Sequence, residues 1–204
     1  MTSDHRIALH LDQFDVLTEV INVGVGRAAY SLSEMMQCRV GLDVPKVDVG
    51  RWPDASFDVA LDGAASIVSQ SFSGAVEGTA ALVFQRSSAC ALVGFLTEAA
   101  EDSIEIDAER EAVLTEVGNI IINGVLGSLG NLTSLDVQFG LPRYCEGSLA
   151  PVLGEAHTRS TVIVGVVFSI AERAVQGRLG IMFDLPALSS VWALLDPTAG
   201  ACAT

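Results

Sequence analysis

One sequence pattern occurs twice in this chain at a constant separation, and this repetition limits the folds that the chain can adopt. The tetrapeptide Leu-Thr-Glu-Val stands at 17–20 and again at 114–117, and an asparagine follows each glutamate three residues later. A proline lies 23 residues beyond each asparagine, so every landmark recurs 97 residues on. Two copies are too few for a solenoid. We therefore expect two related halves that share a core.

Both halves show the same succession of hydrophobic patterns. Apolar residues at three- and four-residue steps predict a long amphipathic helix, and alternating β-branched segments predict strands. In the first half we expect a helix from the N-cap Asp12 to about Gln37, a strand over 39–49 with Pro45, and a loop with an edge element over 51–62. Two strands over 65–72 and 78–84, joined by a turn near 73–74, follow this loop. A helix capped by Ser87 or Ser88 then runs to Leu96. The second half, after a connector over 98–105, predicts a helix from Asp107 to about Leu129, a strand over 135–144 with Pro142, strands over 161–170 and 178–183, and a closing helix over 186–195.

These elements predict an α+β fold with one domain over residues 1–204. Its two repeats, about 11–97 and 107–195, each consist of a long helix, a strand, a pair of strands and a short helix. Neither repeat has enough strands to cover its apolar helix. We therefore expect a single fused sheet with a pseudo-twofold and with the two long helices on one face.

Composition excludes several classes of partner. The chain has 25 acidic and 11 basic residues and a net charge of −14, and its single lysine is Lys46. Nucleic acids and anionic membranes require clustered bases, so we expect neither as a partner. The longest apolar run, 161–171, is about half the ~20 residues of a membrane helix, so no membrane insertion is expected. The first residues show no signal-peptide pattern, and we predict a cytoplasmic location.

The cysteines and histidines do not form a metal-binding pattern. They are far apart in the sequence and show no ligand spacing with one another: Cys38, Cys90, Cys145, Cys202, His5, His10 and His157. We expect the cysteines to be small buried side chains in a reducing compartment, and we expect no metal site or cofactor of the protein's own.

Polar side chains on the two long helices form candidate sites. Asp15, Glu19 and Asn22 share one face of the first helix, and the second helix carries the equivalent stripe Ala112, Glu116, Asn119 and Asn123. A solvated helix face would explain any single such pair. Asparagine is unfavourable in a helix interior, however, and the second helix keeps this stripe beside three consecutive isoleucines. The repeated pair therefore favours a functional face, which we expect to be exposed in both halves.

A carboxylate and an amide one turn apart suit a particular chemistry. An amide can fix a water molecule with one acceptor and two donors, and amide side chains orient water for in-line attack on phosphoryl groups. The carboxylate can pair with a lysine or arginine of a partner. Such a site would be completed by a protein that brings the phosphoryl group and its own Mg²⁺.

These residues resemble the signature of the CheC/CheX/FliY phosphatases of chemotaxis. The stretch from Glu19, Glu-Val-Ile-Asn-Val-Gly-Val-Gly-Arg-Ala-Ala-Tyr-Ser-Leu-Ser, is similar to the first CheC motif. The stretch from Glu116, Glu-Val-Gly-Asn-Ile-Ile-Ile-Asn-Gly-Val-Leu, is similar to the second. CheX-like proteins generally retain one motif, and FliY adds a flagellar-switch domain for which this chain has no residues. The double motif therefore favours a CheC-like protein.

The resemblance implies roles for the site residues. Asn22 and Asn119 would orient the water that hydrolyses the aspartyl-phosphate of CheY, and Glu19 and Glu116 would engage the regulator's lysine. Asp15 would support the first site, whereas the second departs from the family pattern, with Ala112 at the acidic position beside Glu111. We also expect Asn123, Pro45 and Pro142 to have supporting roles. The deamidase CheD is a second implied partner.

Two other functions remain open at this point. A non-catalytic adaptor could bind CheD or a response regulator without turnover, and a flagellar structural role is a third possibility. The intact Glu–Asn pair in both halves favours the enzyme over the adaptor.

The acid excess has two explanations, a salt-rich cytoplasm and the ordinary acidity of proteins from a GC-rich genome, and we favour the first. In that case the melting temperature should rise as salt increases from ~0.1 M to molar concentrations, beyond what screening of exposed pairs provides. Thermal unfolding across this salt series measures the effect. An unchanged melting temperature would support the compositional explanation.

Overall fold

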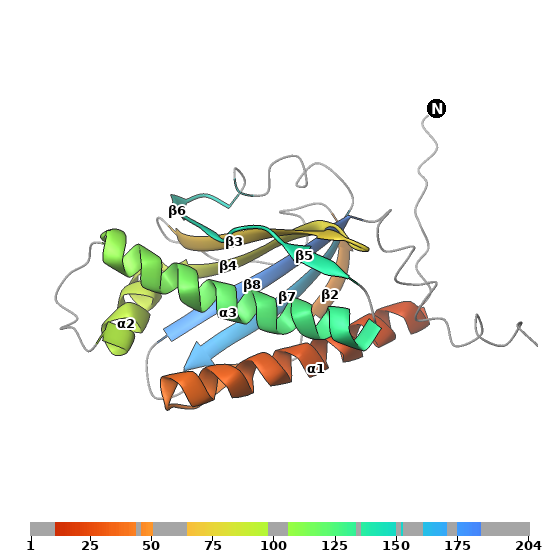
Figure 1. Ribbon diagram of the computed structural model, residues 1–204, viewed down its shortest axis with the longest axis horizontal. Helices are drawn as coiled ribbons and strands as arrows, with labels where there is room; N and C mark the ends of the chain where they lie inside the picture. The colour runs from red at the N-terminus through yellow and green to blue at the C-terminus, as the bar shows by residue number, and fades with distance from the viewer. Residues whose placement is uncertain are drawn as a thin grey trace, which may run out of the picture.

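The computed structural model describes residues 11–43, 46–50, 65–97, 106–133, 136–149, 152, 161–170 and 175–184. The elements follow one another in the order α1 (Leu11–Met36), β1 (Val40–Leu42), β2 (Lys46–Gly50), β3 (Ala65–Gly74), β4 (Gly78–Gln85), α2 (Arg86–Thr97), α3 (Ala108–Thr133), β5 (Val137–Phe139), β6 (Arg143–Gly147), β7 (Thr161–Ile170) and β8 (Val175–Asp184) (Figure 1). Within these residues, no helix is both long and apolar enough to cross a membrane.

The described strands form one antiparallel sheet. Its order is β1-β7-β8-β4-β3-β5, and β2 pairs with β7 while β6 pairs with β3. The sheet curls around the helices, as Figure 1 shows. The predicted α+β class with a single antiparallel sheet is therefore confirmed.

The short strands of each half pair with the other half. Strands β1 and β2 lie beside β7, and β5 and β6 lie beside β3. The two halves meet in the middle through β4 and β8, where Leu82 pairs with Leu179, its counterpart 97 residues later. A residue that pairs with its own counterpart marks a local twofold axis. The same displacement separates the first residues of α1 and α3, of β1 and β5, and of β2 and β6.

Helices α1 and α3 lie side by side and run in opposite directions (Figure 1). Their backbones approach closely because small residues meet at the contact. A Cβ atom on Gly24 would lie 2.8 Å from the carbonyl oxygen of Val125, and one on Gly124 would lie 3.0 Å from the Cβ of Ala28. Larger side chains at either glycine would force the helices apart.

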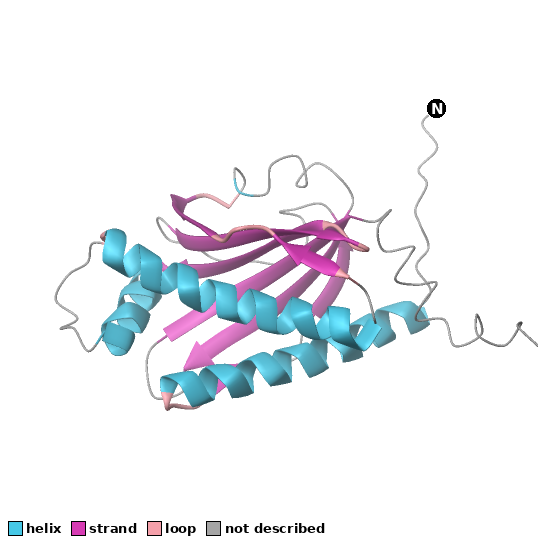
Figure 2. Ribbon diagram, in the orientation of Figure 1, coloured by secondary structure: helices cyan, strands magenta, loops and turns pink. Residues whose placement is uncertain are grey.

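All three helices contribute to one buried cluster with one face of the sheet (Figure 2). Its largest fully buried side chains are Leu17, Ile21, Leu32, Leu82, Phe84, Leu92, Leu114, Ile121, Ile122, Phe168 and Phe183. A smaller cluster around Ile67, Val83, Leu149 and Met182 lies on the other face. The helix-covered face therefore holds most of the core of the described residues.

The strands predicted over 39–49 and 135–144 are each split in two, which corrects the expectation that each is continuous. From Phe139 to Arg143 the chain advances four residues, whereas their partners in β3 are Phe72 and Ser69, three residues apart. One extra residue on the outer strand makes a bulge. Pro142 stands in this segment and has no N–H for the ladder, which explains the interruption. The registers of β1 and β2 on β7 contain the same extra residue.

Helix boundaries differ from the predictions in detail. Asp107 caps α3 as expected, because the amide of Arg110 donates to its Oδ1 at 3.0 Å. Helix α2 begins at Arg86, so Ser88 is not its cap, and the Ser88 Oγ instead accepts from the amide of Gln176 at 3.3 Å. Helix α3 and strand β8 extend to Thr133 and Asp184, beyond the ends that the sequence predicts. The predictions for 51–62, 98–105 and 186–195 lie outside the described residues.

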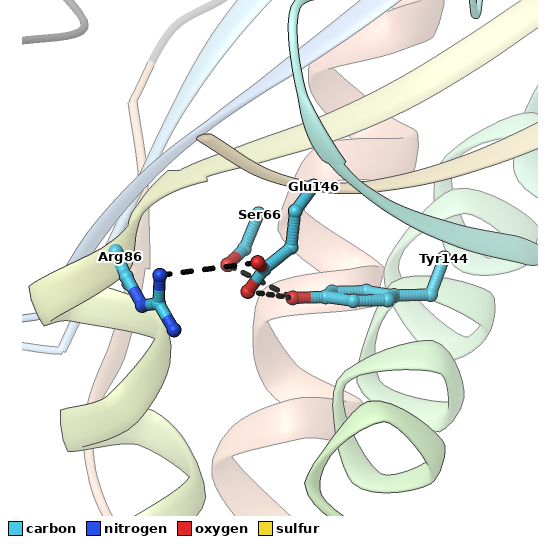
Figure 3. Close-up of polar contacts among 4 residues, drawn as sticks. All are labelled: Ser66, Arg86, Tyr144 and Glu146. Atoms are coloured by element: carbon cyan, nitrogen blue, oxygen red, sulfur yellow. Dashed lines mark hydrogen bonds and ion pairs between the residues drawn. The ribbon is translucent and has the colours of Figure 1, made fainter. Parts of the chain in front are cut away.

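A polar cluster joins β6 to β3 near the start of α2 (Figure 3). The Tyr144 hydroxyl lies 3.1 Å from both the Ser66 Oγ and the Glu146 Oε1, and an Arg86 nitrogen lies 3.9 Å from Glu146. Burial raises the pKa of Tyr144 to about 12, helped by the negative charges of Glu146 and Glu111 and opposed by the Ser66 hydrogen bond. The neutral phenol is therefore part of the folded state.

Gly118 provides a test of how closely α3 approaches the sheet. A Cβ atom at this position would lie 2.4 Å from Cγ1 of Val68 and 2.7 Å from its Cβ, and valine has little rotamer freedom to yield. We expect Gly118→Ala to lower the free energy of unfolding by about 1–2 kcal/mol, measured by urea denaturation. The matched control is Gly127→Ala on the same helix, which meets nothing within 4 Å and should stabilise by up to about 1 kcal/mol. Equal effects of the two substitutions would contradict the close packing.

Tyr144 can be titrated separately because the chain has two tyrosines, Tyr30 and Tyr144. In a Tyr30→Phe variant, the ultraviolet absorbance of tyrosinate should rise with a midpoint about 12. Because this pKa exceeds the ordinary value of 10.0, the phenol's contribution to stability is complete below pH 10 and is lost as the pH rises through about 12. Glu146→Gln should lower the midpoint by removing a nearby negative charge. A midpoint at the ordinary value with the fold intact would contradict the cluster.

Candidate functional site

The first candidate face lies along the N-terminal half of α1. Asp15 and Glu19 are exposed, and within the described residues no cation pairs with either carboxylate. Asn22, one turn after Glu19, is half-buried, and its side chain makes no hydrogen bond to any residue that the structure describes. The face therefore presents an unpaired carboxylate beside an unpaired amide.

The second face lies on α3 and has the same pair in a different setting. Glu116 is exposed, whereas Asn119 is half-buried and accepts two hydrogen bonds on its Oδ1. Asn123 Nδ2 donates to this oxygen at 2.7 Å, and Gln70 Nε2 lies 3.4 Å from it. Ala112, where the first face has Asp15, is exposed.

The expectation that both asparagines are exposed is wrong. Asn22 and Asn119 stand next to the buried stripe of their helices, where Ile21 and Gly118 face the core. Each asparagine therefore lies at the boundary between core and solvent. The glutamates, by contrast, are exposed.

Apolar side chains flank each glutamate on the helix surface. Val16 and Val23, three residues before and four after Glu19, are each 36 % exposed. Val113 and Ile120 hold the corresponding positions around Glu116 and are half-buried. A carboxylate between two apolar side chains can pair with a partner's cation while this apolar rim excludes water, as the contacts around a hot-spot residue do.

The two prolines of the repeat differ in what the structure shows. Pro142 is half-buried in the bulge between β5 and β6, two residues after Gly140, whose carbonyl accepts from Gln70 Nε2 at 2.9 Å. Gln70 thus links the segment of Pro142 to Asn119 and supports placing Pro142 near the second face. Pro45 lies outside the described residues.

Sequence reasoning missed Gln70. This residue is 3 % exposed on β3 and points towards the helices, between Val68 and Phe72 in the alternating pattern. A glutamine at the inward position between Val68 and Phe72 was the available signal. A buried amide needs partners, and those partners are the second face and Gly140.

The first face lacks this support. The strand registers place Phe72 opposite Phe139 and Phe168 opposite Leu42, so the counterpart of Gln70 on β7 is Val166. The counterpart of Asn123 on α1 is Gly26. The two faces therefore share the Glu–Asn pair but differ in what holds the asparagine.

The arrangement can bind and orient a partner's reacting groups. The carboxylates can take a cation, and the amides can hold a water molecule or a phosphoryl oxygen. Within the part of the chain that the structure describes, no group of three His, Cys, Asp or Glu side chains could hold a metal ion.

Comparison with known proteins identifies the group to which this chain is similar. The family described as chemotaxis phosphatase CheX matches residues 66–165, a segment that contains Gln70, Glu116, Asn119 and Pro142. The structure of Thermotoga maritima FliY is similar over 92% of this chain and 98% of that chain, with a TM-score of 0.73 and 16% identity.

Two further structures share the fold. The FliM middle domain from H. pylori is 14% identical over 92% of this chain and 100% of that chain, with a TM-score of 0.67. CheX from Vibrio vulnificus is 14% identical over 81% of this chain and 99% of that chain, with a TM-score of 0.58. At these identities the structures establish the fold alone, which occurs both in a chemotaxis protein and in a FliM domain. Together with the family match over residues 66–165, they show that the chain is similar to the CheC/CheX/FliY chemotaxis phosphatases.

Proposed function

We propose that this protein hydrolyses the aspartyl-phosphate of a CheY-type response regulator through two Glu–Asn faces. The observation that carries the proposal is that Glu19/Asn22 and Glu116/Asn119 occupy corresponding positions on two antiparallel helices, with both carboxylates exposed and unpaired within the described residues. A helix face that served only solubility would not need an amide at the core boundary in both halves. The match of residues 66–165 to a phosphatase family supports the same function.

Docking would depend on the apolar rim and the central carboxylate. Val16 and Val23 would contact an apolar surface of the regulator, while Glu19 takes the ammonium group of its active-site lysine. Glu116 would act likewise between Val113 and Ile120. This chain has a net charge of −14, so it would repel an acidic regulator at long range. Pairing of the regulator's lysine with Glu19 or Glu116 would offset this repulsion.

The reaction would be an in-line displacement at phosphorus. A water molecule held by Asn22 or Asn119 forms the new P–O bond while the bond from phosphorus to the regulator's aspartyl oxygen breaks. The aspartate leaves with the electron pair, and the proton lost by the water goes to the released phosphate. The regulator's own Mg²⁺ would neutralise the developing charge, so this chain would contribute position rather than covalent chemistry.

An internal duplication would account for the two faces. The common displacement of α1 and α3, and the pairing of Leu82 with Leu179, support a scaffold copied together with its site. One domain over 1–204, with repeats over about 11–97 and 107–195, fits this origin, because each half supplies edge strands to the other. The two long helices on one face would then be copies of one element.

A non-catalytic adaptor is the second candidate, and the FliM likeness favours it. Similar structures include complexes of FliM from H. pylori with FliG and with SpeE, so this fold also serves protein binding in other proteins. The adaptor would bind a response regulator or CheD at the same faces without turnover. CheD is also a candidate second partner of the phosphatase, and the cytoplasm is the expected location for both functions.

Removal of the two amides separates the phosphatase from the adaptor. Asn22→Ala and Asn119→Ala should each leave the other face active, so each single variant should still accelerate decay of the phosphorylated regulator. The double variant should fall to the regulator's own decay rate, because one positioned hydrogen-bonding group contributes roughly 10²–10³ in rate at such sites. Decay of the labelled phosphoryl group over time measures all three.

The matched control is Asn131→Ala, the same substitution at an exposed position near the end of α3. It should keep full activity, and circular dichroism should show the double variant folded. A double variant that retains full activity would contradict the phosphatase mechanism. No acceleration by the unmodified protein, together with tight binding of the regulator, would favour the adaptor.

A further inference from the structure

We infer that Gln70 is a positioning residue that fixes the amide of Asn119, so that the two faces present asparagines in different states. The inference rests on the proposed phosphatase function and adds a residue that does not itself touch the partner. It makes the second face a pre-ordered site and the first an adaptable one.

The hydrogen bonds determine which way each amide points. The Gly140 carbonyl can only accept, so the group of Gln70 that lies 2.9 Å from it must be the donor Nε2. The same Nε2 lies 3.4 Å from Asn119, so the atom of Asn119 that faces it must be the acceptor Oδ1. Asn123 Nδ2 donates to that oxygen at 2.7 Å. With both lone pairs of Oδ1 occupied, Asn119 turns its Nδ2 donors away from these partners.

Gln70 stabilises the fold less than an apolar residue would at this buried position. Its Oε1 is buried and, like Asn123 Oδ1, has no hydrogen-bond partner among the described residues, which costs stability. Val166 at the corresponding position of β7 is 2 % exposed and has no such cost. A local choice that opposes core packing is typical of a functional site.

The backbone brings Gln70 within reach of α3. Gly118 lets the helix approach Val68, two residues from Gln70 on the same face of β3, and α1 has the larger Ile21 at the corresponding position. Gly140 packs against Ser71, where a Cβ atom would lie 2.4 Å from the Ser71 Oγ. The close approach and the carbonyl of Gly140 together hold Gln70 in place.

A fixed amide affects the chemistry at the second face. The Nδ2 donors of Asn119 can hold the oxygen of a water molecule through one lone pair and leave another free to attack phosphorus. Since the orientation is set before the regulator binds, less ordering is needed in the transition state. Asn22, whose side chain makes no hydrogen bond among the described residues, would be ordered by the partner itself.

The test substitutes Gln70 by methionine, which has a similar length and suits the apolar surroundings. In the Asn22→Ala background, where only the second face acts, Gln70→Met should lower kcat for regulator dephosphorylation about tenfold with KM unchanged. In the Asn119→Ala background the same change should leave kcat within about twofold, because its target amide is already absent. A loss of kcat of similar size in both backgrounds would indicate a fold effect and overturn the inference. No loss of kcat, or a gain, in the Asn22→Ala background would also overturn it.

A second measurement does not depend on catalysis. The order parameter of the side-chain NH2 group, measured by NMR relaxation, should be higher for Asn119 than for Asn22, and Gln70→Met should remove most of the difference. Equal order parameters in the unmodified protein would overturn the positioning role even if the enzyme is active. A high order parameter at Asn119 without any phosphatase activity would instead reject the proposed function and leave the positioning intact.

Discussion

The antiparallel pairing of β4 with β8 is the contact on which the rest of the arrangement depends. It joins the two halves at Leu82 and Leu179 and sets the axis that relates them. The edge strands of each half then pair with the long outer strand of the other, and α1 and α3 meet through Gly24 and Gly124. Helices α1 and α3 run in opposite directions, and each carries its own Glu–Asn pair.

The symmetric scaffold supports two sites that are not identical. The pair on α3 is linked to the sheet through Gln70. On β7 the counterpart of Gln70 is Val166, and the pair on α1 has Asp15 one turn earlier. A single backbone plan therefore allows one asparagine to be held by the protein and the other to remain adjustable.

Much of the fold could be predicted from the sequence, because hydrophobic periodicity and a constant displacement are local signals. The long helices, the β3–β4 pair and the Asp107 cap follow from them. The bulge at Pro142 was missed because a broken strand and a continuous one share the same alternation, and only the register on β3 separates them. The pairing of β5 and β6 with the other half, and the bond from Gln70 to Asn119 across 49 residues, depend on tertiary contacts that no local pattern records.

The proposed function requires that a phosphorylated regulator docks on the Glu–Asn faces of α1 and α3. An NMR titration of the labelled protein with a receiver domain that carries a stable phosphoryl mimic measures this docking. We expect the perturbed amides to centre on Glu19–Asn22 and Glu116–Asn119, including Val16 and Val23, and we expect the unmodified receiver to perturb them weakly. Perturbations centred on the opposite face of the sheet, around Leu149 and Cys145, would contradict it.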